Sequence, residues 1–144
     1  RKYGLEFMDL VYGDKNVYST VRDMLKWDQA MYDGKLFSAE TLQAAFTGYS
    51  YEKAGQRNYG LGWRMTEVDN GKKIIYHNGW WHGNNTVFIR LPEEKATIIV
   101  LGNKYNRNIY HAKQLCDLFG DYKQSHNNFQ DAESEPSMAT GGSQ

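Results

Sequence analysis

The sequence predicts an α+β domain in which an antiparallel sheet is flanked by helices, and three features of the pattern lead to this prediction. Two amphipathic segments come first, a group of strand-like runs joined by short turns follows, and another amphipathic segment comes after them. No helical segment separates consecutive strands, which favours an antiparallel sheet over a parallel one. A chain of 144 residues is long enough for one domain with a core of its own.

Two helices are expected ahead of the strands. The first follows Thr20, which has the spacing of a capping box with Asp23, and it ends at Gly34. The second is expected from Ser38 to about Gly48. One face of the first helix repeats every 3.6 residues and is apolar apart from one acid, with the members Val21, Met24, Leu25, Asp28 and Met31.

Short turns divide the middle of the chain into strands. A polar loop is expected over residues 49–58, ahead of the first strand. Asp69-Asn70-Gly71 predicts a hairpin because Asn-Gly tolerates the positive φ of tight turns, and residues 92–95 predict a second one. The strands expected on this basis are residues 59–67, 73–77, 86–91 and 96–101.

A last helix is expected over residues 107–119, where it would cover one face of the sheet. Its apolar face consists of Ile109, Ala112, Leu115, Cys116 and Phe119. We expect residues 1–122 to form the folded part of the chain. Residues 123–144 are polar and carry too little apolar surface to offset the entropy of ordering, so we expect a mobile tail there.

Charge balance and composition exclude several classes of function. Lys and Arg number 17, as do Asp and Glu, so bulk electrostatics gives no basis for nucleic-acid binding. The longest apolar runs, such as Ala96 to Leu101, are far shorter than the roughly 20 residues that span a bilayer. The single cysteine, Cys116, allows no internal disulfide and no cysteine-based zinc site.

The most unusual segment is Tyr76-His77-Asn78-Gly79-Trp80-Trp81-His82-Gly83. Glycines let a ligand approach the backbone and histidine titrates near neutral pH, so the segment is a candidate site. The alternative is a loop bracketed by Gly79 and Gly83, with the tryptophans packed over a sheet edge. No metal is expected, because His77 and His82 would point to opposite faces of a continuous strand and no carboxylate has a suitable spacing.

Four segments, taken in order, resemble one known family. They are residues 13–27, residues 59–63 (Tyr-Gly-Leu-Gly-Trp), residues 77–79 (His-Asn-Gly) and residues 98–103. This order resembles the C-terminal half of serine beta-lactamase-like proteins, in particular the class C beta-lactamase and D-alanyl-D-alanine carboxypeptidase type. The resemblance covers residues 13–121 and implies that the fold is the C-terminal portion of a beta-lactamase-like domain.

The resemblance also implies roles for the strand motif. His77 would hold the carboxylate of the substrate by a hydrogen bond or by its charge. The backbone N–H of Trp80 would be one of two oxyanion-hole donors, each of which typically contributes about 2.7–4 kcal/mol to transition-state stabilisation. The remaining positions would contact the substrate or shape its access, and they are Asn78, Gly79, Trp81 and His82.

The nucleophile that the family uses is not expected in this chain. Ser50-Tyr51-Glu52-Lys53 has the bare Ser-x-x-Lys spacing, but it falls in the predicted polar loop and no Tyr-x-Asn lies between it and His77. We therefore expect a C-terminal fragment that is inactive alone, that lacks the N-terminal part of its domain and that self-associates through the uncovered surface. The resemblance implies a periplasmic or cell-envelope parent that acts on a small-molecule or peptide acyl substrate without a metal or organic cofactor.

The alternative from another class is a non-catalytic binding module for a glycan or peptide. Trp63, Trp80, Trp81 and the many tyrosines would then form an aromatic platform. Exposed and coplanar indole faces would favour the platform. An open edge beside His77, with the Trp80 N–H pointing into it, would favour the hydrolase.

Overall fold

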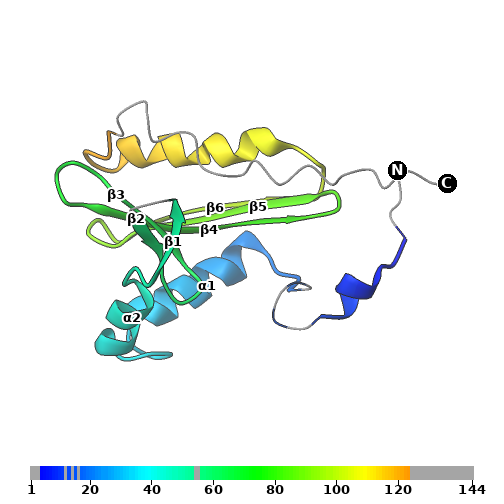
Figure 1. Ribbon diagram of the computed structural model, residues 1–144, viewed down its shortest axis with the longest axis horizontal. Helices are drawn as coiled ribbons and strands as arrows, with labels where there is room; N and C mark the ends of the chain where they lie inside the picture. The colour runs from blue at the N-terminus through cyan, green and yellow to red at the C-terminus, as the bar shows by residue number, and fades with distance from the viewer. Residues whose placement is uncertain (1–3, 12, 14, 16, 54–55, 124–144) are drawn as a thin grey trace.

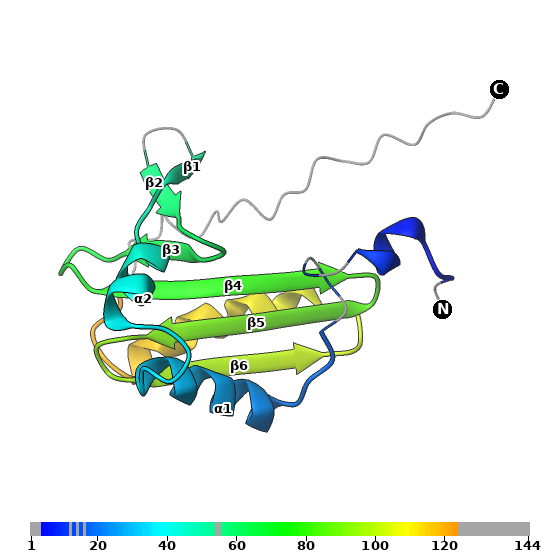
Figure 2. The same cartoon turned by 90° about the horizontal axis from the view of Figure 1, so that it is seen from below.

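A six-stranded antiparallel sheet is the central layer of the molecule, with its strands side by side in chain order. The computed structural model describes residues 4–11, 13, 15, 17–53 and 56–123, so that all but the first residue of the expected tail lies outside the described residues. Figures 1 and 2 show helix α1 on one face of the sheet and helix η2 on the other. The predicted fold class is thus confirmed. The elements are η1 (Phe7–Leu10), α1 (Val21–Tyr32), α2 (Ala39–Ala45), β1 (Ser50–Lys53), β2 (Gln56–Tyr59), β3 (Arg64–Glu67), β4 (Lys73–Trp81), β5 (Asn84–Leu91), β6 (Ala96–Gly102) and η2 (Arg107–Leu118).

Side-chain hydroxyls cap both helix starts, and the first of these caps was predicted from the sequence. The Thr20 hydroxyl accepts a hydrogen bond from the backbone N–H of Asp23 at 3.2 Å, and the Ser38 hydroxyl accepts one from Thr41 at 3.2 Å. Each bond satisfies a backbone donor that the first turn of a helix leaves without an intrahelical partner. The second helix is shorter than predicted, because it ends at Ala45.

The prediction for residues 49–67 is wrong in two respects. The expected polar loop contains β1 and β2, and the expected single strand over residues 59–67 is two strands, β2 and β3. The chain turns between them, where the Gly60 N–H donates to the Trp63 carbonyl at 2.7 Å and Gly62 adopts a φ of 76°. Aromatic residues with high strand propensity flank this turn, and they favoured one continuous strand although Gly60 and Gly62 are typical turn residues.

Gly60 lies where the chain passes the end of α2. A Cβ atom at this position would lie 2.1 Å from the carbonyl oxygen of Ala45 and 2.9 Å from that of Thr47. Both contacts are with backbone atoms, so no side-chain rotation relieves them. We expect Gly60→Ala to lower the free energy of unfolding in urea by about 1–3 kcal/mol, the usual cost of overpacking. Gly4→Ala, where the new Cβ has nothing within 4 Å, is the matched control, and equal effects of the two substitutions would contradict this packing.

β4 is longer than predicted. It continues past His77 to Trp81, and a turn formed by His82 and Gly83 leads directly into β5. The segment 76–83 is therefore the end of a hairpin, and the alternative of a loop bracketed by two glycines is wrong.

The sheet face under η2 carries the main hydrophobic cluster. η2 is a 3₁₀ helix, in which residues three apart lie in one row, and its innermost row contains Tyr110, Lys113 and Cys116. Of the predicted apolar face, Ile109, Ala112 and Cys116 pack against this cluster, whereas Leu115 and Phe119 are 45% and 47% exposed. The buried members of the cluster are Val68, Ile74, Tyr76, Val87, Ile89, Leu91, Ile98, Cys116 and Tyr122.

α1 packs on the opposite face through aromatic and charged groups. The Trp27 ring lies 6.1 Å from that of Trp63 in a stacked arrangement. Asp28 accepts hydrogen bonds from Arg90 Nε at 2.5 Å and from the Thr97 hydroxyl at 2.6 Å, and Asp28 and Arg90 are almost fully buried. This pairing explains why an acid occupies the apolar face of α1. None of the helices in the described part of the chain combines the length and apolar character needed to cross a bilayer.

Candidate active site

The second half of β4 forms an open edge of the sheet. β3 pairs with β4 only from Lys73 to Tyr76, whereas β5 pairs with it as far as Trp81. Among the described strands, residues 77–81 therefore have a ladder partner on one side alone. Figure 2 shows β4 running well past the end of β3.

Hydrogen-bond alternation along the hairpin fixes which backbone groups face this edge. Trp81 and Asn84 flank the turn, and the residues that close a two-residue hairpin exchange both of their backbone hydrogen bonds. Trp80 pairs with Asn85, one step further from the turn, so it belongs to the other class of pair. Its N–H and C=O consequently point away from β5, toward the open edge.

Side chains of the motif are divided between the two faces of the sheet. Successive residues of a strand point to opposite faces, so His77, Gly79 and Trp81 lie on the α1 side and Asn78 and Trp80 lie on the η2 side. The Trp80 ring accordingly lies 6.2 Å from that of Tyr105, which precedes η2. The structure therefore does not bring the Asn78 side chain together with that of His77.

His77 has partners at both ring nitrogens. Its Nε2 lies 3.0 Å from the hydroxyl oxygen of Tyr59, and its Nδ1 lies 2.7 Å from the carbonyl oxygen of Asn78. The rings of Tyr59 and His77 meet edge to face at 6.1 Å. Tyr59 was not predicted as a site residue, although the Tyr-Gly-Leu-Gly-Trp run that begins with it was a signal for its importance.

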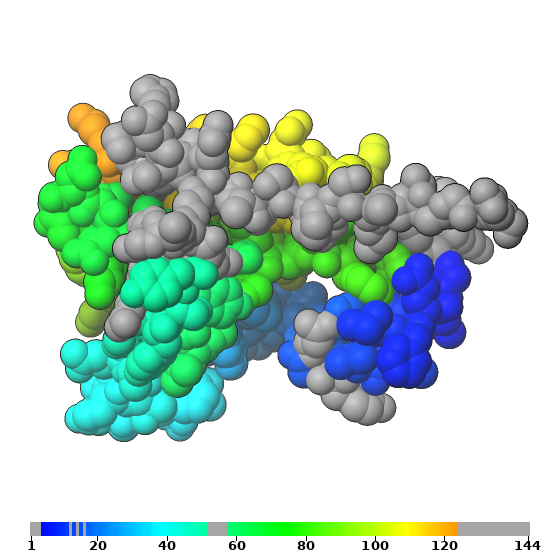
Figure 3. Space-filling view, viewed as in Figure 1, coloured from blue at the N-terminus to red at the C-terminus, as the bar shows by residue number. Residues whose placement is uncertain are grey.

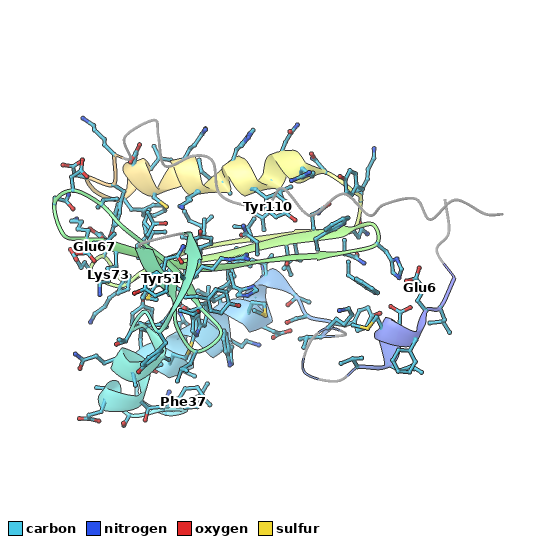
Figure 4. The ribbon with its side chains drawn as sticks, viewed as in Figure 1. Glu6, Phe37, Tyr51, Glu67, Lys73 and Tyr110 are labelled. Atoms are coloured by element: carbon cyan, nitrogen blue, oxygen red, sulfur yellow. The ribbon has the colours of Figure 1, made fainter. Side chains whose placement is uncertain are left out.

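Gly79 occupies a position where a side chain would displace that of a neighbouring strand. A Cβ atom there would lie 2.3 Å from the Oγ1 of Thr86, its cross-strand neighbour. Its carbonyl oxygen accepts a hydrogen bond from the Tyr110 hydroxyl at 3.1 Å, and that hydroxyl accepts one from the Asn85 amide at 2.9 Å. Figure 4 shows Tyr110 between η2 and the sheet. These bonds tie the glycine backbone to the helix behind it.

Trp81 and His82 contact the N-terminal segment rather than an open surface. The Trp81 indole N–H donates to the carboxylate of Asp9, and His82 Nε2 lies 3.4 Å from the same oxygen. Lys15 Nζ lies 4.2 Å from the centre of the Trp81 ring. Hydrogen bonds from the Glu6 backbone and then from Trp81 lower the pKa of Asp9. Figure 3 shows the N-terminal segment in blue beside this end of the sheet, away from α2 in cyan.

His82 adopts a φ of 50°, in the left-handed region that few residues other than glycine enter. It lies in the turn and not in the strand, so the expectation that it would face away from His77 on a continuous strand does not apply. Neither Asp9 nor Lys15 was predicted, since their contacts span more than 60 residues of sequence.

The tryptophans do not form a platform. Trp63 stacks on Trp27 and its ring also lies 5.7 Å from that of Phe88. Trp80 and Trp81 lie on opposite faces of β4, so their indoles do not share a plane. This arrangement does not support the aromatic binding module.

Other candidate groups lie away from this edge. Burial raises the pKa of the Cys116 thiol to about 11, so the thiol is protonated and not nucleophilic at neutral pH. A cavity of about 360 Å³ lies at the opposite end of β4, with Phe46, Lys73 and Glu93 in its lining. No group of three or more metal-ligating side chains occurs among the residues that the structure describes.

The fold is the α+β fold that the sequence predicts. At the edge of β4 it has a histidine, a glycine and then an outward-facing backbone N–H, in the order of the motif. The Beta-lactamase family model matches residues 2–114. The chain belongs to the Beta-lactamase family, and with it to a serine hydrolase superfamily. The predicted resemblance is thereby confirmed.

A curated relative extends this comparison. Penicillin-binding protein 4* of Bacillus subtilis (strain 168) is 31% identical over 98 residues, which are 68% of this chain and 22% of that protein. The chain thus spans about a fifth of the length of this relative. No solved structure gives a significant match.

Proposed function

We propose that the chain supplies one wall of the acyl-transfer site of a serine hydrolase. The observation that carries the proposal is the open edge of β4, where the Trp80 N–H points outward three residues after His77. In this proposal the Trp80 N–H is an oxyanion-hole donor, and His77 orients the substrate. The residues proposed to bind the substrate or shape its access are Asn78, Gly79, Trp81 and His82.

The nucleophile is proposed to come from a segment outside this chain. Ser50, the one serine with a lysine three residues later, lies in β1 and not at the N-terminus of a helix. The acyl group of an amide or ester would pass to the external serine and then to water. The outward N–H would stabilise the oxyanion of each tetrahedral intermediate.

The same proposal divides the chain into residues 1–122, as part of a beta-lactamase-like domain, and a polar tail. Support for a covering partner comes from apolar side chains along the N-terminal segment. Leu5 is 92% exposed, Phe7 82% and Tyr18 91%. Water-exposed apolar groups on this scale mark surfaces that another segment or a second copy of the chain covers.

The substrate class follows from the relative. Penicillin-binding protein 4* is named for penicillin binding, so we propose that the site accepts a strained amide or an activated ester. Turnover of nitrocefin and of a p-nitrophenyl ester would be measured for this chain and for the longer protein that contains it.

We expect turnover in the longer protein and none in the chain alone, because the oxyanion donor and His77 do not replace a nucleophile. Ser50→Ala in the longer protein is the control, and it is expected to leave the rate unchanged. Turnover by the chain alone, or its loss in the longer protein through Ser50→Ala, would contradict a nucleophile outside residues 1–144.

A further inference from the structure

The partners of His77 determine which of its nitrogens exchanges a proton. The Nδ1 atom faces the Asn78 carbonyl oxygen at 2.7 Å, and a carbonyl oxygen only accepts hydrogen bonds. Nδ1 therefore carries a hydrogen in the neutral imidazole and in the imidazolium alike. Nε2, which faces the Tyr59 hydroxyl at 3.0 Å, is therefore the nitrogen that carries a hydrogen only in the imidazolium.

A tyrosine hydroxyl both donates and accepts, so it can follow this change. While His77 is neutral, the Tyr59 O–H donates to the lone pair on Nε2. When Nε2 is protonated, its N–H donates to the Tyr59 oxygen, and the hydroxyl hydrogen turns toward another acceptor. We propose that Tyr59 is a positioning residue of the site, which converts protonation of His77 into a hydroxyl donor directed at the substrate.

This inference rests on the proposed function for its catalytic meaning and specifies what His77 offers there. A neutral His77 has no N–H left for a substrate, because Nδ1–H is held by Asn78 and Nε2 accepts from Tyr59. A carboxylate-bearing acyl substrate would therefore accept a hydrogen bond from the Tyr59 hydroxyl while the imidazolium donates to the Tyr59 oxygen. Hydrogen bonds to charged groups are about twice as strong as neutral ones. A bound anion therefore favours the arrangement in which Nε2–H donates to the Tyr59 oxygen and the Tyr59 hydroxyl donates to the anion.

Surrounding elements hold the pair and determine the nearby charges. The Tyr59 carbonyl oxygen accepts the Tyr49 backbone N–H at 2.9 Å, which anchors the end of β2. From β3, the Arg64 guanidinium carbon lies 5.7 Å from the centre of the Tyr59 ring. From β5, the uncharged Phe88 is the cross-strand neighbour of His77. From α1, the acid Asp28 faces the same side of the sheet but is paired with Arg90.

The test is a pH titration of the 144-residue chain by NMR, with ¹⁵N-labelled histidine and ¹³Cζ-labelled tyrosine. We expect the His77 Nε2 signal to change from that of a bare ring nitrogen to that of a protonated one, while Nδ1 retains the signal of a protonated nitrogen throughout. The Tyr59 Cζ signal is expected to shift with the same midpoint. Titration at Nδ1, or a constant Cζ signal while Nε2 titrates, would overturn the proposal.

Tyr59→Phe provides a second readout. In the neutral form, the Nε2 signal is expected to move to that of a ring nitrogen without a hydrogen-bond donor, while Tyr49→Phe leaves it in place. An unmoved Nε2 signal in folded Tyr59→Phe would overturn the proposal, and the wild-type titration decides it if this variant does not fold. Both measurements need no turnover, so failure of the hydrolase proposal and failure of this inference are separate results.

Discussion

Replacement of Asp28 by alanine is expected to lower the free energy of unfolding by about 3–5 kcal/mol, which is the usual cost of removing one partner of a buried ion pair. Asp28 and Arg90 are 2% and 1% exposed, and Asp28 also accepts from the Thr97 hydroxyl. Without the carboxylate, the Arg90 guanidinium remains buried beside the Tyr32 ring, whose centre lies 4.4 Å away. The ring offers attraction to a cation but no hydrogen-bond acceptor equal to a carboxylate.

Urea unfolding followed by tryptophan fluorescence measures this effect. Lys35→Ala, which removes an exposed ion pair with Asp33, is the control and is expected to change the free energy by less than about 1 kcal/mol. Equal losses in the two variants would contradict the account of α1 packing. If Asp28→Ala does not fold, the double variant Asp28→Leu with Arg90→Leu is expected to recover a folded chain, since apolar replacement of a buried pair is often neutral.

Local signals predicted the helices and hairpins well. The Thr20 cap, the Ser38 cap and the turn at Asn70-Gly71 each depend on residues within four positions of one another, and the structure has all three. The acid on the apolar face of α1 was also predicted, but its partner was not. Arg90 lies 62 residues further along the chain, and no local pattern connects the two.

The errors of the predicted secondary structure lie in two segments, residues 59–67 and η2. Residues 59–63 begin and end with aromatic residues of high strand propensity, but Gly60 and Gly62 lie between them, and Gly62 at φ 76° lies in the turn that separates β2 from β3. In η2, Ile109, Ala112 and Cys116 of the predicted apolar face pack against the core, but Leu115 is 45% exposed. Neither outcome is encoded in hydrophobic periodicity alone.

The sequence proposes a candidate site around residues 77–82, but it does not predict the internal arrangement of these residues. Only the register of β4 shows that His77 and the Asn78 side chain occupy opposite faces. Tyr59 reaches His77 across 18 residues, and Asp9 reaches Trp81 across 72. Such contacts depend on tertiary packing, which sequence spacing does not specify.

The second large effect is expected at the backbone of Trp80. Proline has no N–H, and in a sheet it is tolerated where that N–H would point away from the ladder. The Trp80 N–H faces the open edge, so Trp80→Pro removes no hydrogen bond to β5. If this N–H stabilises an oxyanion, its loss is expected to lower kcat by about 10²–10³-fold.

Two substitutions separate the backbone from the side chain and from the fold. Trp80→Ala keeps the N–H while it removes the indole, which is 47% exposed, and it is expected to fold like Trp80→Pro. Trp81→Pro places a proline at the next position, where the backbone N–H of residue 81 pairs with Asn84. That substitution is expected to destabilise the hairpin, because proline cannot donate to the ladder.

The central claim is that the open edge of β4 supplies an oxyanion donor, and comparison of Trp80→Pro with Trp80→Ala in the longer protein tests it most directly. Acylation and turnover of nitrocefin would be measured for both variants, with circular dichroism to confirm that both are folded. We expect Trp80→Pro to be slower than Trp80→Ala by about 10²–10³-fold. Equal rates in two folded variants would contradict it.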